Sequence, residues 1–97
     1  MWVMARSIVI TELGLRSLQR SPLSKVEGAV LWHLAEHLPV TGSVVSKTAL
    51  GADLSIRNSH VTRTMKRLCE IGFLLRGPKL GVSYHYKLNP AFFRILS

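Results

Sequence analysis

The sequence has little cysteine, little acid and no long apolar run. Its 97 residues include one cysteine, Cys69, which excludes an internal disulfide and a cysteine-rich zinc site. The apolar start of the chain is interrupted by Arg6 and is too short for a signal peptide or a membrane span. The chain shows no phosphate-binding loop, no nucleophile with its base and no catalytic pair of carboxylates. These absences argue against an enzyme, a cofactor or a small-molecule ligand, and favour a cytoplasmic protein.

The charge imbalance is large and unevenly placed. The chain has 13 basic and 5 acidic residues, for a formal net charge of +8 at pH 7. From Ser55 onwards only Glu70 is acidic, and this part of the chain carries all but one unit of the surplus. Such a surplus on a small domain indicates a polyanionic partner, usually nucleic acid and less often a membrane surface. With 47% hydrophobic residues, the chain can still bury one core.

The apolar residues recur with helical and strand periods, which predicts a single α+β domain that is mainly α. Residues 1–20 are expected to form a strand or extended arm and then a short helix, Glu12 to Arg20. We expect this arm either to pack on its own domain or to reach a second subunit. Ser24 and Glu27 have the spacing of a capping box, at the start of a helix over residues 25–38. That helix carries an apolar stripe, Val26, Val30, Leu34 and Leu38.

The stretch from Val44 to Arg76 has the organisation of a helix-turn-helix. A short strand leads to a short helix over residues 47–54, a turn at Ser55-Ile56 and a longer basic helix that opens at Arg57. On the longer helix one face is apolar, with Val61, Met65 and Leu68. The opposite face is polar, with Ser59, Thr62, Arg63, Lys66 and Glu70. A helix with such a polar face fits the major groove of B-form DNA.

A hairpin is predicted directly after the basic helix. Residues 73–76 and 82–88 have strand character, and residues 77–81 are rich in the glycine, proline and lysine of a loop. A hairpin in this position is a wing. Residues 73–88 therefore complete a winged helix-turn-helix with a small antiparallel sheet, flanked by N- and C-terminal segments.

The polar side chains of this winged unit are the predicted DNA contacts. Those expected in the major groove are Arg57, Asn58, Ser59, His60, Thr62, Arg63, Lys66 and Arg67. Those expected on the wing or the phosphate backbone are Lys47, Arg76, Lys79 and Lys87. Arg63 suits guanine and Asn58 suits adenine, because their hydrogen-bonding groups match those base edges. The alternative is a solvated surface, which for His60 and Lys87 is equally consistent with the sequence.

Apolar side chains outside the winged unit suggest a homodimer. A short helix is predicted over residues 90–97, capped by Asn89, and its apolar residues are too many to be left in water. Trp32 projects away from the stripe of its own helix. The candidates for a dimer interface are therefore Trp32, Phe92, Phe93, Ile95 and Leu96.

Two histidines are candidate metal ligands. His33 and His37 are four residues apart on a predicted helix, which is metal-ligand spacing, but no third ligand is evident. We therefore expect no metal site. Cys69 is interpreted as a small, partly buried core residue, with redox sensing as the alternative.

The chain resembles a known family over residues 44–90. The pattern is similar to that of RepL-type winged-helix replication proteins of plasmids and phages, and its residues here are Leu54, Ile56, Val61, Arg63, Leu68, Gly72, Phe73, Leu74 and Arg76. The strand ending at Asn89-Pro90 is similar to that family's closing Tyr-x-hydrophobic-Asn-Pro. MarR-like regulators of bacteria share the first half of the pattern. This chain departs from it with Ser55 where glycine is usual and Arg57 where a capping serine is usual.

The resemblance implies double-stranded DNA binding in a prokaryotic cell. The sequence thus predicts a sequence-specific DNA-binding protein, either a transcriptional regulator or a plasmid or phage replication protein. The alternative is a winged-helix module that binds another protein and no DNA. It predicts that Arg63 and Lys66 are dispensable for binding oligonucleotides.

Overall fold

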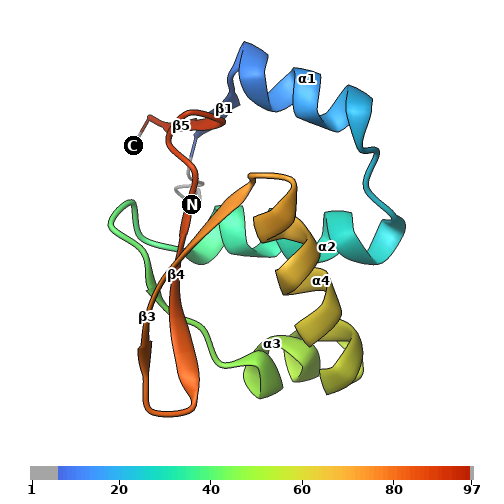
Figure 1. The fold of residues 1–97 in the computed structure, drawn as a ribbon, viewed down its shortest axis with the longest axis vertical. Helices are drawn as coiled ribbons and strands as arrows, with labels where there is room; N and C mark the ends of the chain where they lie inside the picture. The colour runs from blue at the N-terminus through green and yellow to red at the C-terminus, as the bar shows by residue number, and fades with distance from the viewer. Residues whose placement is uncertain (1–6, 97) are drawn as a thin grey trace, which may run out of the picture.

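The computed structural model describes residues 7–96, which fold around one buried core (Figure 1). In chain order the elements are β1 (Ile8–Ile10), α1 (Glu12–Arg20), α2 (Lys25–His37), β2 (Ser43–Val44), α3 (Lys47–Leu54), α4 (Asn58–Glu70), β3 (Leu74–Leu80), β4 (Ser83–Leu88) and β5 (Phe93–Ile95). Along the long axis, α1 and the β1–β5 pair lie at one end, and α3 with the tip of the β3–β4 hairpin lies at the other. No helix within residues 7–96 has both the length and the apolar character needed to cross a bilayer.

Helix α2 begins with the predicted capping box. The Ser24 hydroxyl accepts a hydrogen bond from the Glu27 backbone N–H at 3.1 Å, and the Glu27 carboxylate accepts one from the Ser24 N–H at 2.9 Å. The predicted stripe faces the core, since Val30, Leu34 and Leu38 are buried. Leu31, beside the stripe, is fully buried as well. This helix packs against both α3 and α4 and so fixes the position of the helix-turn-helix.

The turn between α3 and α4 has the backbone geometry that the helix-turn-helix requires. Ser55 adopts a left-handed conformation with φ of 56°, a region that glycine enters more easily. Gly51 lies against the turn, where a Cβ would come 2.6 Å from the Ile56 carbonyl oxygen. Val61 and Met65 are fully buried, as the helical period of α4 predicts.

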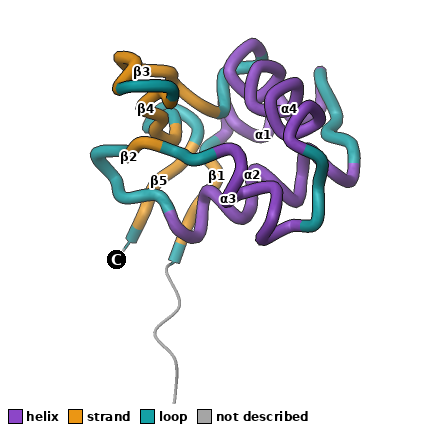
Figure 2. The backbone as a smooth tube through the Cα atoms, turned by 90° about the horizontal axis from the view of Figure 1, so that it is seen from below, coloured by secondary structure: helices purple, strands orange, loops and turns teal. Residues whose placement is uncertain are grey.

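The wing, formed by β3 and β4, belongs to a three-stranded antiparallel sheet in the order β2-β4-β3. Strand β3 runs through Leu80 and includes most of the predicted loop, with a register shift between Arg76 and Lys79. Gly77-Pro78 lies at this irregularity of β3, which is an edge strand. Proline is tolerated on edge strands and at bulges. The hairpin turns at Gly81 and Val82, so the prediction that Val82 begins the next strand is wrong; its side chain is 95% exposed. In Figure 2 the sheet stands beside the helices, and α4 and the hairpin lie along the same side of the molecule.

The predicted C-terminal helix over residues 90–97 is wrong. Asn89 opens only one turn, in which its carbonyl accepts from the N–H groups of Phe92 and Phe93. The chain then extends as β5 and pairs antiparallel with β1, from Ile10 opposite Phe93 to Ile8 opposite Ile95. The strand is favoured because β1 supplies hydrogen-bond partners and Phe93 can enter the core. Residues 7–11 thus lie on their own domain, although Met1 to Arg6 and Ser97 fall outside the described residues.

Candidate nucleic-acid interface

Helix α4 presents a polar face that most of the predicted DNA contacts share. Six of them are exposed to solvent: Arg57, Asn58, Ser59, Thr62, Arg63 and Lys66. His60 and Arg67 are half-buried and lie toward α2. The buried residues of α4 include Thr64, so even a polar position on the α2 side is closed to solvent. The surface open to a large partner therefore runs along the outer face, from Arg57 to Lys66.

The N-terminus of α4 lacks the cap that the other helices of residues 7–96 have. Thr11, Ser24 and Ser46 each accept a hydrogen bond from an N–H in the first turn of α1, α2 and α3. Arg57 occupies the equivalent position of α4 and makes no side-chain cap hydrogen bond. No acidic residue lies in that first turn either. The first turn of α4 is thus electropositive, because the helix dipole and Arg57 have the same sign there.

Thr62 uses its hydroxyl within the helix. The Oγ1 atom donates to the Asn58 backbone carbonyl at 3.1 Å, one turn earlier. The Thr62 O–H is therefore not free to donate to a base or a phosphate. The methyl group and the acceptor lone pairs of Oγ1 remain open to a partner.

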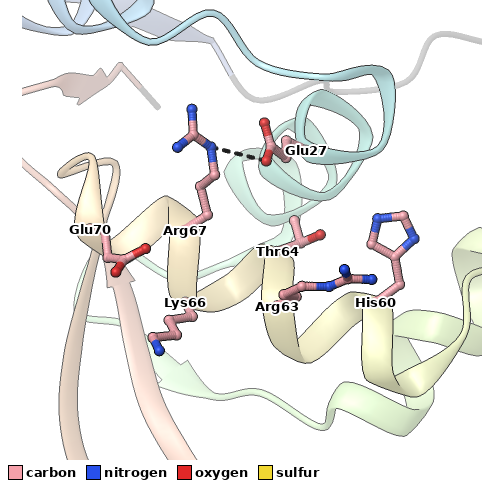
Figure 3. Close-up of a pocket in the computed structure, with 7 residues that line it drawn as sticks. All are labelled: Glu27, His60, Arg63, Thr64, Lys66, Arg67 and Glu70. Carbon is pink, nitrogen blue, oxygen red and sulfur yellow. Dashed lines mark ion pairs between the residues drawn. The ribbon is translucent and has the colours of Figure 1, made fainter.

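Arg67 is directed toward α2 and away from Lys66 (Figure 3). Its Nε atom lies 3.1 Å from the Glu27 carboxylate, whose other oxygen accepts the capping-box hydrogen bond. The Glu27 side chain is only 16% exposed, so this ion pair is better shielded than a surface pair. Arg67 thus ties α4 to the start of α2, a role that its place in the sequence does not reveal.

Two of the wing cations share a face with two tyrosines. Opposite residues of an antiparallel pair point to the same side of the sheet. Arg76 therefore lies on the same face as Tyr86, and Lys79 on the same face as Tyr84. The Arg76 guanidinium carbon lies 4.5 Å from the centre of the Tyr84 ring, and the Lys79 Nζ lies 5.7 Å from it. Lys87 alternates onto the other face of β4, so the hairpin does not bring it together with the other two.

Apart from Arg67, the cations of α3, α4 and the wing have no acidic partner within residues 7–96. Within residues 7–96 the ion pairs are Arg16 with Glu12, Arg67 with Glu27, and the long contact of His33 with Asp53. The cations left unpaired at α3, α4 and the wing are Lys47, Arg57, Arg63, Lys66, Arg76, Lys79 and Lys87. Their charge is therefore directed to solvent or to a partner.

A hollow separates α4 from the base of the wing. It is lined by Lys47, Thr62, Lys66, Cys69, Glu70, Arg76 and Tyr86. Burial raises the pKa of the Cys69 thiol, although the nearby Arg76 and Lys47 charges oppose that rise. Burial is also the main cause that raises the pKa of the Tyr86 hydroxyl. Both groups are therefore protonated at neutral pH.

The remaining predicted residues are not brought together. Phe93 is buried in the chain's own core, and the Phe92 ring packs edge-on against Phe73 at 5.1 Å between centroids. Ile95 is half-buried against the same core, so of the dimer candidates only Trp32 (44% exposed) and Leu96 (63% exposed) keep large exposed apolar surfaces. No group of three or more metal-ligating side chains occurs within residues 7–96.

Glu27, Tyr84 and Tyr86 were not predicted as members of this region. Glu27 was assigned only to its capping box, because a contact with α4 depends on how the helices pack. Tyr84 and Tyr86 are two residues apart in the predicted strand over residues 82–88, which indicates only that they share a face. Their contact with the cations depends on the register between β3 and β4, which the sequence does not specify.

This arrangement of elements matches known structures. The apo form of MarR from E. coli superposes with a TM-score of 0.55 and 20% sequence identity, over 78% of this chain and 54% of MarR. AbfR in its disulfide-formed state gives 0.55 and 18%, over 79% of this chain and 51% of AbfR. The fold is a MarR-like winged helix. The chain spans about half the length of either protein, and at this identity the likeness concerns the fold alone.

The resemblance to RepL-type replication proteins stays a prediction. No protein-family model matches the sequence, and no curated protein matches it either. The winged-helix fold therefore rests on the structure and on its similarity to solved structures such as these two, which does not identify the partner of the exposed cations.

Proposed function

We propose that this protein binds double-stranded DNA with sequence specificity and regulates transcription in the cytoplasm of a prokaryotic cell. Helix α4 enters the major groove, where Arg63 and Asn58 contact base edges. The β3–β4 hairpin lies on the adjacent backbone, where Arg76 and Lys79 contact phosphates, which position the protein without specifying sequence.

One observation carries this proposal. The unpaired cations of α4 and β3 lie on elements along the same side of a winged helix, as Figure 2 shows for the elements themselves. A merely solvated basic surface gives no reason for Glu70 to be the one acidic residue of α4 and the hairpin, or for Arg57 to replace a helix cap. A MarR-like winged helix is also a fold of DNA-binding regulators, which agrees with this reading.

A replication role is the second candidate. It rests on the resemblance of the 54–76 run and of the Asn89-Pro90 ending to RepL-type proteins. The bound DNA separates the two roles, because a regulator selects a site that overlaps a promoter and an initiator selects repeats at an origin. Duplexes selected from a random pool, then located in the source genome, supply that answer.

The test of DNA binding compares charge removal on α4 with the same change elsewhere. Arg63→Ala and Lys66→Ala should each weaken binding to the selected duplex, and the salt dependence of each variant should be shallower than that of the wild type. Arg94→Ala is the matched control, because Arg94 is exposed on β5 at the other end of the molecule. Unchanged affinity in the double α4 variant, with flat salt dependence, would favour the protein-binding module instead.

We further propose that the protein acts as a homodimer. Trp32 borders a hollow between α1 and α2 together with Leu18 and Leu23, and Val9 and Leu96 are exposed on the β1–β5 pair. A dimer that covers this surface leaves α4 and the wing of both copies free for two half-sites. Sedimentation at micromolar concentration should show a dimer that Trp32→Lys weakens. A wild-type monomer under those conditions contradicts the proposal.

A further inference from the structure

The hollow between α4 and the wing brings three cations together from three elements. Lys47 is the first residue of α3, Lys66 lies on α4 and Arg76 lies on β3. Glu70 is the one acidic residue that lines the hollow, so positive charge is in excess there. Three like charges around one concave surface repel one another, and an anion between them relieves that repulsion.

Tyr86 supplies a polar group that has no hydrogen-bond partner within residues 7–96. Its side chain is 97% buried, since only 3% of the residue is exposed. Within residues 7–96 its hydroxyl makes no hydrogen bond, yet it is not sealed from solvent. A buried tyrosine usually satisfies its O–H, so this hydroxyl is a donor directed into the hollow without an acceptor.

Neighbouring side chains fix what the hollow can offer. The Tyr84 ring holds the Arg76 guanidinium at 4.5 Å and so limits its movement away from the site. The Thr62 hydroxyl already donates a hydrogen bond to the Asn58 carbonyl, so it adds no donor to the hollow. The donors are therefore three charged groups and one phenol, and their ligand must be an anion with several acceptor oxygens.

We propose that this hollow binds one phosphate group, with Lys47, Lys66 and Arg76 neutralising its charge and the Tyr86 hydroxyl donating a hydrogen bond to it. The assignment rests on the proposed function, in which the phosphate belongs to the DNA strand that passes between the major groove and the wing. Inorganic phosphate presents the same chemistry, so the experiment needs an arm for each source. The hollow then joins the two reading elements, because α4 and β3 hold the same phosphate.

The first arm changes the hollow and measures the affinity for the selected duplex. Tyr86→Phe removes one oxygen from a buried ring and should raise the Kd about tenfold, the effect of losing a hydrogen bond to a charged group. Its salt dependence should stay that of the wild type, because no charge is lost. Lys47→Gln should instead make the salt dependence shallower by about one unit of slope. Lys25→Gln is the matched control, since Lys25 also follows a serine cap at the start of a helix, and it should leave binding unchanged.

The second arm changes the DNA. Replacing single phosphates of the duplex by uncharged methylphosphonates should reveal one position at which Tyr86→Phe causes no further loss of affinity. If the losses add at every position, or if Tyr86→Phe binds as the wild type does, the inference is overturned. Weakened binding by Arg63→Ala would then still support the proposed function, because Arg63 does not line this hollow. Thermal unfolding of the Tyr86→Phe variant should match the wild type and so excludes misfolding.

The third arm uses Cys69, the single cysteine, as a reporter within the hollow. Its alkylation rate should fall when the selected duplex is bound, because the phosphate covers the thiol. Inorganic phosphate alone at millimolar concentration should protect it much less. Protection by inorganic phosphate without protection by the duplex would retain a phosphate site but overturn its place in DNA binding. No protection by either would overturn the site itself.

Discussion

Replacing Arg57 by serine should stabilise the protein and weaken its binding to DNA. Arg57 has φ of −61° and ψ of 144°, close to the extended angles of the Ser24 cap at −68° and 168°. A serine there can accept a hydrogen bond from an N–H of the first turn without a change of backbone. Such a cap stabilises a helix by about 1 kcal/mol. Removing a positive charge from the helix start adds ~0.3–1 kcal/mol.

Thermal unfolding measures the first half of this prediction. For a domain of this size, a gain of about 1 kcal/mol corresponds to a Tm that is about 4–8 °C higher. Arg57→Ala is the matched control, because it removes the same charge without adding a cap. The difference in Tm between Arg57→Ser and Arg57→Ala therefore isolates the cap, and equal values would refute the capping argument.

Salt-dependent binding measures the second half. If Arg57 contacts a phosphate, both variants should lose affinity to a similar extent, and the slope of log K against log salt should become shallower by about 0.9. If the stabilised serine variant binds the duplex with wild-type affinity, Arg57 does not contribute to DNA binding. Opposite changes in stability and affinity would show that the missing cap has a functional reason.

Three further predictions concern the supports of α4. Gly51→Ala should lower the stability of the protein by more than 1 kcal/mol in chemical unfolding, because its Cβ would meet the Ile56 carbonyl oxygen at 2.6 Å. Glu27→Gln should lower it by ~0.5–1 kcal/mol by removing the ion pair with Arg67, and added salt should shrink the difference. Burial raises the pKa of the Cys69 thiol above its ordinary value of 9.0. Cys69 should therefore be alkylated slowly at pH 7 and faster as the pH rises above 9.0. The unfolded thiol loses its proton first, so this group also makes the protein less stable as the pH rises above that value.

The helical parts of the fold could be predicted from the sequence because their signals are local. The Ser24-Glu27 capping box and the four-residue stripe of α2 each depend on residues within a few turns. The same holds for α4, where Val61 and Met65 alternate with polar residues at helical period. Helices predicted from such local patterns are also found in the folded structure, because the apolar face that the pattern defines packs against the core.

The C-terminal strand could not be predicted in the same way. Residues 91–96 are apolar at most positions, so neither a helical nor a strand period stands out. Their conformation is decided by β1, which lies more than eighty residues earlier in the chain. The same pairing brings the Phe92 carbonyl against Gly14, where a Cβ would come within 2.8 Å. The glycine that weakens α1 as a helix is therefore needed for the approach of the C-terminal segment.

The candidate site was predicted at the level of elements and not of individual contacts. Position along α4 identifies which residues face away from the core, but Arg67 and Arg63 differ in a way that position does not show. Arg67 meets a carboxylate on α2, whereas Arg63 has no acidic partner within the described residues. A partner four residues away on the same helix can be found from the sequence, as Glu12 and Arg16 illustrate. A partner on another helix becomes visible only when the packing is known.

The placement of acid along α4 gives the exposed face of this helix a direction. The helix starts at Arg57 without a cap or an acid, and it ends at Glu70, the one acidic residue on this element. The helix dipole has the same sense, positive at the start and negative at the end. The placement of charged side chains and the helix dipole both favour an anionic partner at the first turns of α4 and disfavour it at the last turn. Arg67, the basic residue of the last turn of α4, is paired with Glu27. Under the proposed function the wing supplies further cations there, and Arg76, held on Tyr84 beside the hollow, is placed to do so. Under the proposed function, helix and wing are in this sense two parts of one electrostatic surface.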